Sequence, residues 1–267
     1  MDQDVFSGTF ALVTGASSGL GEEFARQLAH RGCNLVLTGR SREKLETLGS
    51  DLARINGVAT RIVTADLSQP GGAEQLALIV DDLGIPIDHL INNAGFGSAG
   101  GFADSEAERQ TGMVRVNVES VVYLSRHFLP GMVKRDHGGI INLGSTAAYQ
   151  PTPYMATYGA SKAFILSFSA ALASELERTK VRVLACCPGF VPTGFQSAAG
   201  VPEGSAPKIA QLEPNAVVQG ALDAYVARRV VYVPGAMNSV QTTLSKVLPR
   251  AVVVRAARYT MRKLDRS

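Results

Sequence analysis

This chain of 267 residues has few cysteines and no long apolar run, and each of these features excludes certain classes of protein. The three cysteines, two of them adjacent as Cys186 and Cys187, form neither a disulfide framework nor the spacing of a metal site. No apolar run reaches the roughly 18 residues that a membrane span requires, and residues 1–4 do not begin a signal peptide. We therefore expect a reduced, cytoplasmic protein that binds no metal.

Charge is also scarce and unevenly distributed. Charged residues make up 18% of the chain against 46% hydrophobic residues, which is typical of a folded domain rather than a disordered one. Residues 237–267 hold seven Lys or Arg and one Asp, a net charge of +6, which leaves −3 of the total +3 for the rest. The body of the chain therefore lacks the basic charge of a nucleic-acid-binding protein, and we expect no nucleic-acid partner.

Short apolar runs alternate with helical patterns along most of the chain. The runs predicted as strands are residues 10–14, 34–38, 61–65, 89–91, 139–143, 181–186 and 230–233. Helical spacing follows the first two strands near residues 24–29 and 43–55, and then covers residues 73–83, 105–132, 157–178 and 213–227. This alternation predicts a single α/β domain, a Rossmann-type doubly wound parallel sheet of seven strands. Ligands bind such sheets beyond the carboxyl ends of the strands.

A glycine-rich loop lies between the first predicted strand and the first helix, with the sequence Thr14-Gly-Ala-Ser-Ser-Gly-Leu-Gly21. Its glycines allow a sharp turn and close approach to a pyrophosphate, whose charge would lie at the helix N-terminus. The alternative is an ordinary strand–turn–helix junction made of small residues. The position between strand and helix favours nucleotide binding.

The end of the second strand indicates which nicotinamide cofactor binds. Sites for NAD carry an acid here that holds the ribose 2′-hydroxyl, whereas this chain has Gly39-Arg40. A guanidinium can pair with a 2′-phosphate, so we expect NADP(H), with NAD(H) or a solvated loop cation as the alternatives. Asp66 and Leu67 close the third strand, where the carboxylate would contact the adenine amino group or cap the next helix.

Candidate catalytic residues follow later strands. Tyr158 and Lys162 are four residues apart and share a helix face. Ser145 ends the fifth strand, Asn117 lies inside the long helix, and Asn-Asn-Ala-Gly at residues 92–95 ends the fourth strand. Each feature has an ordinary structural explanation alone, but their joint occurrence favours catalysis.

With these motifs in this order, residues 8–236 resemble the compact short-chain dehydrogenases/reductases. The resemblance implies a tetrad of Asn117, Ser145, Tyr158 and Lys162. It also implies cofactor contacts at Gly15, Ser17, Ser18, Gly19, Leu20, Gly21, Arg40, Asp66, Leu67, Asn93, Ala94, Gly95, Tyr158, Lys162, Pro188, Gly189, Val191 and Thr193. The glycine spacing differs from that of the epimerase-type members, so we do not expect sugar-nucleotide chemistry.

The residue types suit hydride transfer between a nicotinamide and a carbonyl or alcohol. A ketone reduced by hydride needs a proton. A nearby ammonium, together with the positive nicotinamide ring of the oxidised cofactor, is expected to lower the pKa of Tyr158 from its usual value of about 10. Tyr158 then acts as acid in reduction and as base in oxidation. Ser145 would hold the substrate oxygen, Lys162 the nicotinamide ribose, and Asn117 a water that relays protons to Lys162.

The segments expected to line the substrate cleft, residues 144–161 and 188–202, contain no charged side chain. They offer apolar and aromatic residues, so we expect a small apolar carbonyl or alcohol substrate. The side chains available for lining are Phe96, Tyr149, Tyr154, Met155, Phe190 and Phe195. The alternative is that they pack against the fold and select nothing. The irregular stretch 189–214 is predicted to be a mobile substrate loop.

The C-terminal segment differs in composition from the rest. We divide the chain into a dinucleotide-binding catalytic domain, residues 1–236, and a basic helical extension, residues 237–267. Arg255, Arg258, Arg262 and Arg266 recur at helical spacing, which favours a solvated basic face over a packed apolar stripe. Contact with an anionic membrane surface is the less favoured alternative. The resemblance further implies a homodimer formed through the helices of Asn117 and Tyr158. A non-catalytic nucleotide-binding, redox-sensing module remains the rival function.

Overall fold

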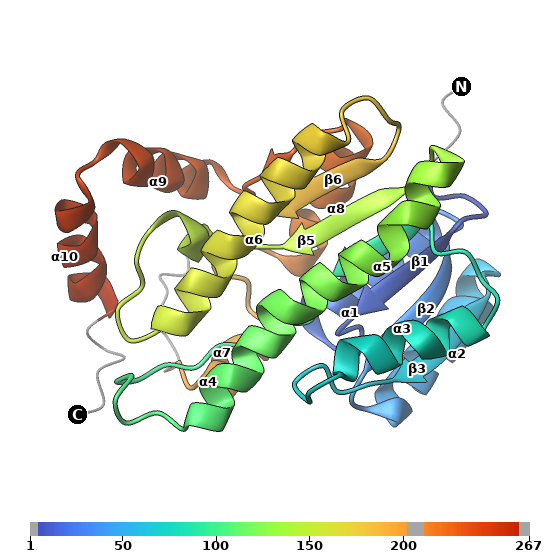
Figure 1. The fold of residues 1–267 in the computed structure, drawn as a ribbon, viewed down its shortest axis with the longest axis horizontal. Helices are drawn as coiled ribbons and strands as arrows, with labels where there is room; N and C mark the ends of the chain where they lie inside the picture. Colours follow the sequence, from blue (N-terminus) through green and yellow to red (C-terminus); the bar gives the residue numbers. More distant parts are fainter. Residues whose placement is uncertain (1–4, 202–210, 262–267) are drawn as a thin grey trace.

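The computed structural model describes residues 5–201 and 211–261. Within them, seven parallel strands form one sheet in the order β3-β2-β1-β4-β5-β6-β7 (Figure 1). Their bounds are β1 Phe10–Thr14, β2 Asn34–Gly39, β3 Thr60–Thr64, β4 His89–Asn92, β5 Gly139–Leu143, β6 Arg182–Cys186 and β7 Val231–Tyr232. The predicted doubly wound sheet is confirmed. Strands β2 and β3 are added on one side of β1, and β4 to β7 are added on its other side. The order of strand addition therefore reverses after β3, and the crevice for a ligand opens beside β1.

Helices cover both faces of this sheet. They are α1 Gly19–His30, α2 Arg42–Asn56, α3 Gly72–Asp82, α4 Ala107–Val114, α5 Ser120–Arg135, α6 Ala156–Glu175, α7 Phe195–Ala199, α8 Pro214–Val226, α9 Ala236–Val247 and α10 Arg250–Met261. The helix predicted over residues 105–132 is α4 and α5 joined by a π-helical turn, Arg115–Glu119. The stretch predicted to be irregular contains α7, and residues 202–210 of it lie outside the described residues.

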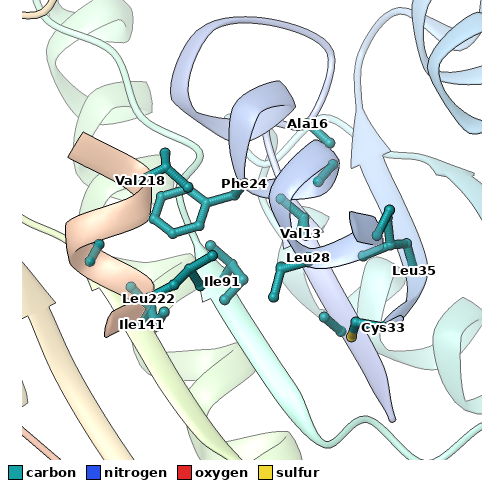
Figure 2. Close-up of a cluster of buried hydrophobic side chains, with 14 of the residues drawn as sticks. Val13, Ala16, Phe24, Leu28, Cys33, Leu35, Ile91, Ile141, Val218 and Leu222 are labelled. Carbon is teal, nitrogen blue, oxygen red and sulfur yellow. The ribbon is translucent and has the colours of Figure 1, made fainter. Parts of the chain in front are cut away.

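Strand side chains alternate between two separate cores, as the period of two requires. In β1, Ala11 and Val13 join the core under α1 and α8, whereas Leu12 joins the core under α3 and α5. Figure 2 shows the first core, where Phe24 and Leu28 of α1 meet residues of α8. Full burial of each such side chain stabilises the fold by about 1.5–3 kcal/mol.

The C-terminal segment forms two helices rather than one. The break falls at Leu248, whose extended backbone (ψ 146°) is the conformation that the following Pro249 favours. The predicted basic positions Arg262 and Arg266 lie outside the described residues. None of the described helices is both long and apolar enough to cross a membrane.

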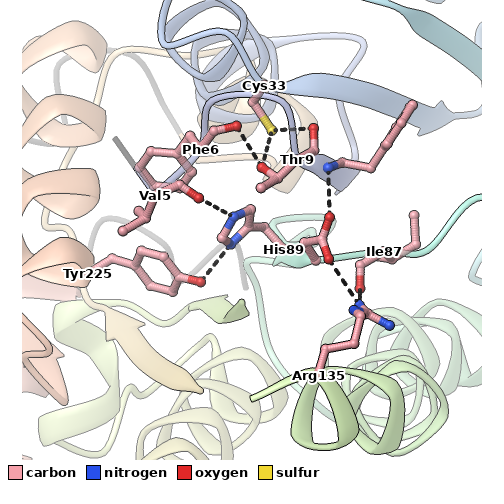
Figure 3. Close-up of polar contacts among 10 residues, drawn as sticks. Val5, Phe6, Thr9, Cys33, Ile87, His89, Arg135 and Tyr225 are labelled. Carbon is pink, nitrogen blue, oxygen red and sulfur yellow. Dashed lines mark hydrogen bonds and ion pairs between the residues drawn. The ribbon is translucent and has the colours of Figure 1, made fainter. Parts of the chain in front are cut away.

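A buried polar network holds the amino ends of the strands (Figure 3). His89 of β4 is fully buried; its Nε2 lies 3.1 Å from the Val5 carbonyl and its Nδ1 lies 2.7 Å from the Tyr225 hydroxyl. A carbonyl can only accept, so Nε2 carries the proton and Tyr225 donates to Nδ1. Burial lowers the pKa of His89 to about 4, so the imidazole is neutral and ties the N-terminal segment to α8.

Candidate active site

One cavity of about 560 Å³ opens at the carboxyl ends of the strands and extends from the glycine loop to α10. The predicted cofactor residues that line it are Gly15, Ser17, Ser18, Gly19, Leu20, Arg40, Asp66, Leu67, Asn93, Ala94, Gly95, Tyr158, Lys162, Pro188, Gly189, Val191 and Thr193. Ser145 also lines it, whereas Gly21 and Asn117 do not. Among the described residues, no group of three or more His, Cys, Asp or Glu could hold a metal ion.

The glycine loop shows why its glycines are required. Gly15 and Gly19 have φ values of 67° and 59°, a region that side chains strongly disfavour. A Cβ on Gly15 would also lie 2.9 Å from Nδ2 of Asn93, which itself donates to the Thr14 carbonyl at 2.8 Å. A Cβ on Gly21 would clash with the Gly15 carbonyl. Gly21 is therefore a packing position beneath the loop, and its predicted contact with a cofactor stays a prediction.

The cavity fits a dinucleotide on its glycine-loop side. Helix α1 begins at Gly19, and the side chain of its N-cap, Ser18, makes no capping hydrogen bond. The first N–H groups of the helix and the Ser18 hydroxyl are thus placed for a pyrophosphate. Thr38 at the end of β2 lines the cavity, and its buried Oγ1 has no hydrogen-bond partner among the described residues. A bound nucleotide would satisfy such an atom.

Arg40 and Asp66 lie at the outer end of this side. None of the ion pairs or hydrogen bonds among the described residues involves Arg40, whereas Arg42 pairs with Glu46 at 3.0 Å. Asp66 Oδ1 accepts from the backbone and the hydroxyl of Ser68, at 3.0 and 2.7 Å. Burial raises the pKa of Asp66, but the Ser68 hydrogen bonds and the Arg40 charge outweigh burial and lower it. Asp66 stabilises its own turn rather than capping α3, which begins at Gly72.

The catalytic candidates Ser145, Tyr158 and Lys162 meet in the middle of the cavity. Ser145 caps a short 3₁₀ turn, where its Oγ accepts from Ala147 N at 3.1 Å. The Lys162 ammonium donates to the Leu143 carbonyl at 2.6 Å and lies 5.8 Å from the centroid of the Tyr158 ring. The carboxyl end of β5 and the first turns of α6 thus place all three groups.

The electrostatics of these groups differ from the sequence prediction. Burial raises the pKa of Tyr158 to about 12, although its hydrogen bond with Ser145 acts in the opposite direction. In the protein without cofactor, desolvation of the phenolate outweighs the ammonium, and the lowering expected with an oxidised nicotinamide beside the ring stays a prediction. Burial also lowers the pKa of Lys162 to about 8. At neutral pH the phenol is protonated and can donate.

Asn117 lies behind the cavity, in the π-helical turn. Its Nδ2 donates to the Phe96 carbonyl and to Ser161 Oγ, both at 3.0 Å, and its Oδ1 accepts from Phe96 N at 3.1 Å. A Cβ on Gly95 would lie 3.1 Å from Asn117 Oδ1 and 3.5 Å from Lys162 Nζ. The Asn117 side chain therefore joins the turn after β4 to α6, and its amide is fully engaged in doing so.

The substrate side of the cavity is apolar. Of the six predicted side chains, four line it: Phe96, Met155, Phe190 and Phe195. Tyr149 is not among the lining residues, and the Lys246 ammonium lies over its ring, 5.0 Å from nitrogen to centroid. Tyr154 packs outside the cavity against the cluster of Met155 and Ala199. The charged residues that line the cavity are Arg40, Asp66 and Lys162, and the apolar lining also includes Val201.

Two lining residues come from the C-terminal extension and were missed by the sequence reasoning. Thr260 and Met261, at the end of α10, line the cavity, and Met261 packs with Met155 and Ala199. The spacing of Val253, Ala257 and Met261 at every fourth residue was the available signal, since it predicts an inward stripe. The stripe does face inward, as Val253 and Ala257 are buried.

Comparison with known proteins agrees with this arrangement. A model of the family described as short chain dehydrogenase matches residues 9–203, more than half of the chain. The chain is a short-chain dehydrogenase. The family consists of oxidoreductases that bind a nicotinamide cofactor, so the sequence resemblance is confirmed.

Relatives of this dehydrogenase differ in the reactions that their names describe. A very-long-chain 3-oxoacyl-CoA reductase of Phaeosphaeria nodorum is 37% identical over 66% of this chain and 53% of its own length, so the match spans about half of that relative. A 7β-hydroxysteroid dehydrogenase of Collinsella aerofaciens is 33% identical over 81% of this chain and 82% of its own. A short-chain dehydrogenase from Sphingobium yanoikuyae in complex with NADPH superposes with a TM-score of 0.79 at 31% identity, covering 91% and 97% of the two chains.

Proposed function

We propose that this dehydrogenase reduces an apolar ketone or aldehyde to the alcohol with NADPH, with Tyr158 as the proton donor. One observation carries the proposal: the phenol of Tyr158 lies with Ser145 and Lys162 in a single cavity that extends from the glycine loop to an apolar wall. A bound nicotinamide supplies the hydride. The protein's own residues must then orient the carbonyl and provide the proton.

Each catalytic side chain has one task in this reaction. The Ser145 hydroxyl holds the substrate oxygen next to Tyr158, and the phenol proton passes to that oxygen as the C–O double bond is reduced. The resulting phenolate is a weaker base than an alkoxide, so the transfer is favourable. Lys162, 5.8 Å from the ring centroid, stabilises the phenolate and binds the nicotinamide ribose. Asn117 holds the relay water through its backbone, because its side chain is engaged; π-helical turns occur mostly at functional sites.

The preference for NADPH rests on Arg40. Its guanidinium is exposed at the cavity rim without an ion-pair partner among the described residues, and the end of β2 carries no carboxylate to repel a phosphate. The NADPH complex of the related enzyme supports the same choice. NAD(H) with the same chemistry is the alternative.

The apolar wall supports the substrate class. Phe96, Met155, Phe195 and Met261 offer hydrocarbon and aromatic surface. Of the described residues that line the cavity, only Arg40, Asp66 and Lys162 are charged, and such a wall suits an apolar substrate better than a phosphate or dicarboxylate. The names of two relatives, which specify a very-long-chain acyl and a steroid substrate, are in keeping with such a wall.

We further propose that the enzyme is a cytoplasmic homodimer. Val122 and Tyr123 of α5 and Phe164 of α6 are exposed apolar residues on the two helices expected to pair, and burying them would stabilise a dimer. The three cysteines, Cys33, Cys186 and Cys187, are buried thiols, which suits a reducing compartment. Light scattering of the purified protein tests the dimer.

A titration tests the cofactor proposal. Purified protein is titrated separately with NADPH and NADH while nicotinamide fluorescence is followed. Selective NADPH binding is expected, and selective NADH binding would reject the role of Arg40 while leaving the enzyme class intact. Binding of neither by folded protein would favour a non-catalytic module.

A further inference from the structure

Helix α9 presents its apolar side to solvent. Met237, Val240, Leu244 and Val247 follow one another at spacings of three, four and three residues and so share one face. These side chains are 66%, 56%, 51% and 73% exposed. A surface helix of a globular protein has the opposite arrangement, with its apolar stripe on the core.

The opposite, polar side of α9 packs against the catalytic domain, residues 1–236. Asn238 and Thr242 are buried, and Asn238 donates to the Pro234 carbonyl at 2.8 Å. Asn238 also packs so closely on the backbone of Gly189 that a Cβ there would lie 2.6 Å from its amide. The Lys246 ammonium covers the Tyr149 ring at 5.0 Å. The orientation of α9 is therefore fixed by specific contacts, and its apolar face is left outward.

Helix α10, which follows α9 at the same end of the molecule, also exposes apolar, basic and aromatic residues. Val252, Arg255 and Tyr259 share its outward face, and Tyr259 is 81% exposed. Residues 236–261 contain four Lys or Arg and no Asp or Glu. Figure 1 shows α9 and α10 at one end of the molecule, beyond the helices that flank the sheet.

We propose that α9 and α10 dock the protein on an anionic lipid surface. An apolar helix face near exposed arginines and an exposed tyrosine matches the interface of a bilayer, where acyl chains lie beneath negative headgroups. A second copy of this chain is a poorer occupant, because a symmetric contact would place these cations against their own copies. The buried stripe of α10 agrees with the packing role preferred from the sequence, and the docking proposal rests in addition on the outward apolar face of α9.

The docking surface adjoins the substrate side of the active site. The inward face of α10 carries Met261, which lines the cavity, while Val252 and Tyr259 face outward. An apolar substrate dissolved in the lipid would then meet the enzyme beside its cavity; this extension rests on the proposed function. Lipid binding itself is measured without catalysis, so the two proposals fail separately.

Sedimentation of the full-length protein with vesicles tests the docking. The vesicles are phosphatidylcholine alone or mixed with phosphatidylserine, and the variant is Val240→Asp with Leu244→Asp. Two exposed residues on other helices, Ile55 (63% exposed) and Leu78 (55%), provide the matched control as Ile55→Asp with Leu78→Asp. We expect wild type and control to bind the anionic vesicles and the α9 variant to bind roughly tenfold more weakly. Circular dichroism confirms that each variant is folded.

Two results would overturn the proposal. One is equal partitioning of the wild type and the folded α9 variant into the anionic vesicles. The other combines two observations on the α9 variant: unchanged vesicle binding, and a smaller assembly than wild type in sedimentation velocity without lipid. Together they would identify this surface as an interface between copies of the chain. Loss of wild-type binding at high salt would support docking, since headgroup attraction is screened.

Discussion

The ammonium of Lys162 lies 5.8 Å from the centroid of the Tyr158 ring and donates to the Leu143 carbonyl at 2.6 Å. The hydrogen bond fixes the ammonium at the end of β5, below the phenol that α6 presents to the cavity. Lys162 is buried and Tyr158 is half-buried. Desolvation shifts their two pKa values away from each other, to about 12 for Tyr158 and about 8 for Lys162.

The pH dependence of carbonyl reduction should report the titration of Lys162. Its charged form is lost as the pH rises through its lowered pKa of about 8, while Tyr158 stays protonated because its pKa is raised. We expect kcat/KM for carbonyl reduction to be level near neutral pH and to fall above about pH 8. The residual activity of Lys162→Arg should lack this fall, since a guanidinium stays charged. An unchanged profile in that variant would assign the fall to another group.

The substitution Arg40→Ala should weaken the binding of NADPH but not that of NADH. The loss of a charged contact to the 2′-phosphate is expected to raise KM for NADPH by roughly tenfold to a hundredfold and to leave KM for NADH unchanged. Arg42→Ala is the matched control, because Arg42 is already paired with Glu46. Equal KM changes for both cofactors in Arg40→Ala would reject the phosphate role.

The substitution Met261→Ala should lower kcat/KM for bulky substrates more than for small ones. Met261 closes the apolar side of the cavity, and removal of its contact surface corresponds to about 1–2 kcal/mol, or roughly tenfold in kcat/KM. Steady-state rates with a bulky apolar ketone and a small ketone measure the difference. Met237→Ala, 66% exposed on α9, serves as the control. A parallel loss for both ketones would indicate a general structural defect.

Stability should decrease on acidification through His89. Its folded-state pKa, about 4, is below the ordinary 6.5, so the unfolded chain binds the proton more readily. The stability contributed by neutral His89 is present above pH 6.5 and is lost as the pH falls toward 4, by about 3 kcal/mol in total. Urea unfolding across this range compares wild type with His89→Gln. If the difference in unfolding free energy between them does not depend on pH, His89 is not the titrating group.

Local patterns predicted most of the scaffold. Buried strands such as β5 read as continuous apolar runs, and the predicted bounds of β5, residues 139–143, match the structure. Residues of the glycine loop, together with Ser145, Tyr158 and Lys162, share one cavity because all of them follow carboxyl ends of strands.

What the sequence did not predict depends on long-range packing. Met261 reaches the cavity because α10 packs against Ala199 of α7 and Met155, and the Tyr149 ring lies against Lys246 of α9. The direction of the Tyr158 pKa depends on burial, which local sequence does not reveal. The outward apolar face of α9 reverses the usual pattern and is visible only once Asn238 is seen to be buried.

The most direct test of the account is NADPH oxidation by wild type and Tyr158→Phe with a panel of apolar ketones. The account predicts turnover by the wild type, a loss in kcat of roughly a hundredfold or more in Tyr158→Phe, and unchanged NADPH affinity, because only the donated proton is removed. Equal turnover by the two proteins, with NADPH bound equally well, would contradict the assignment of Tyr158 as the proton donor.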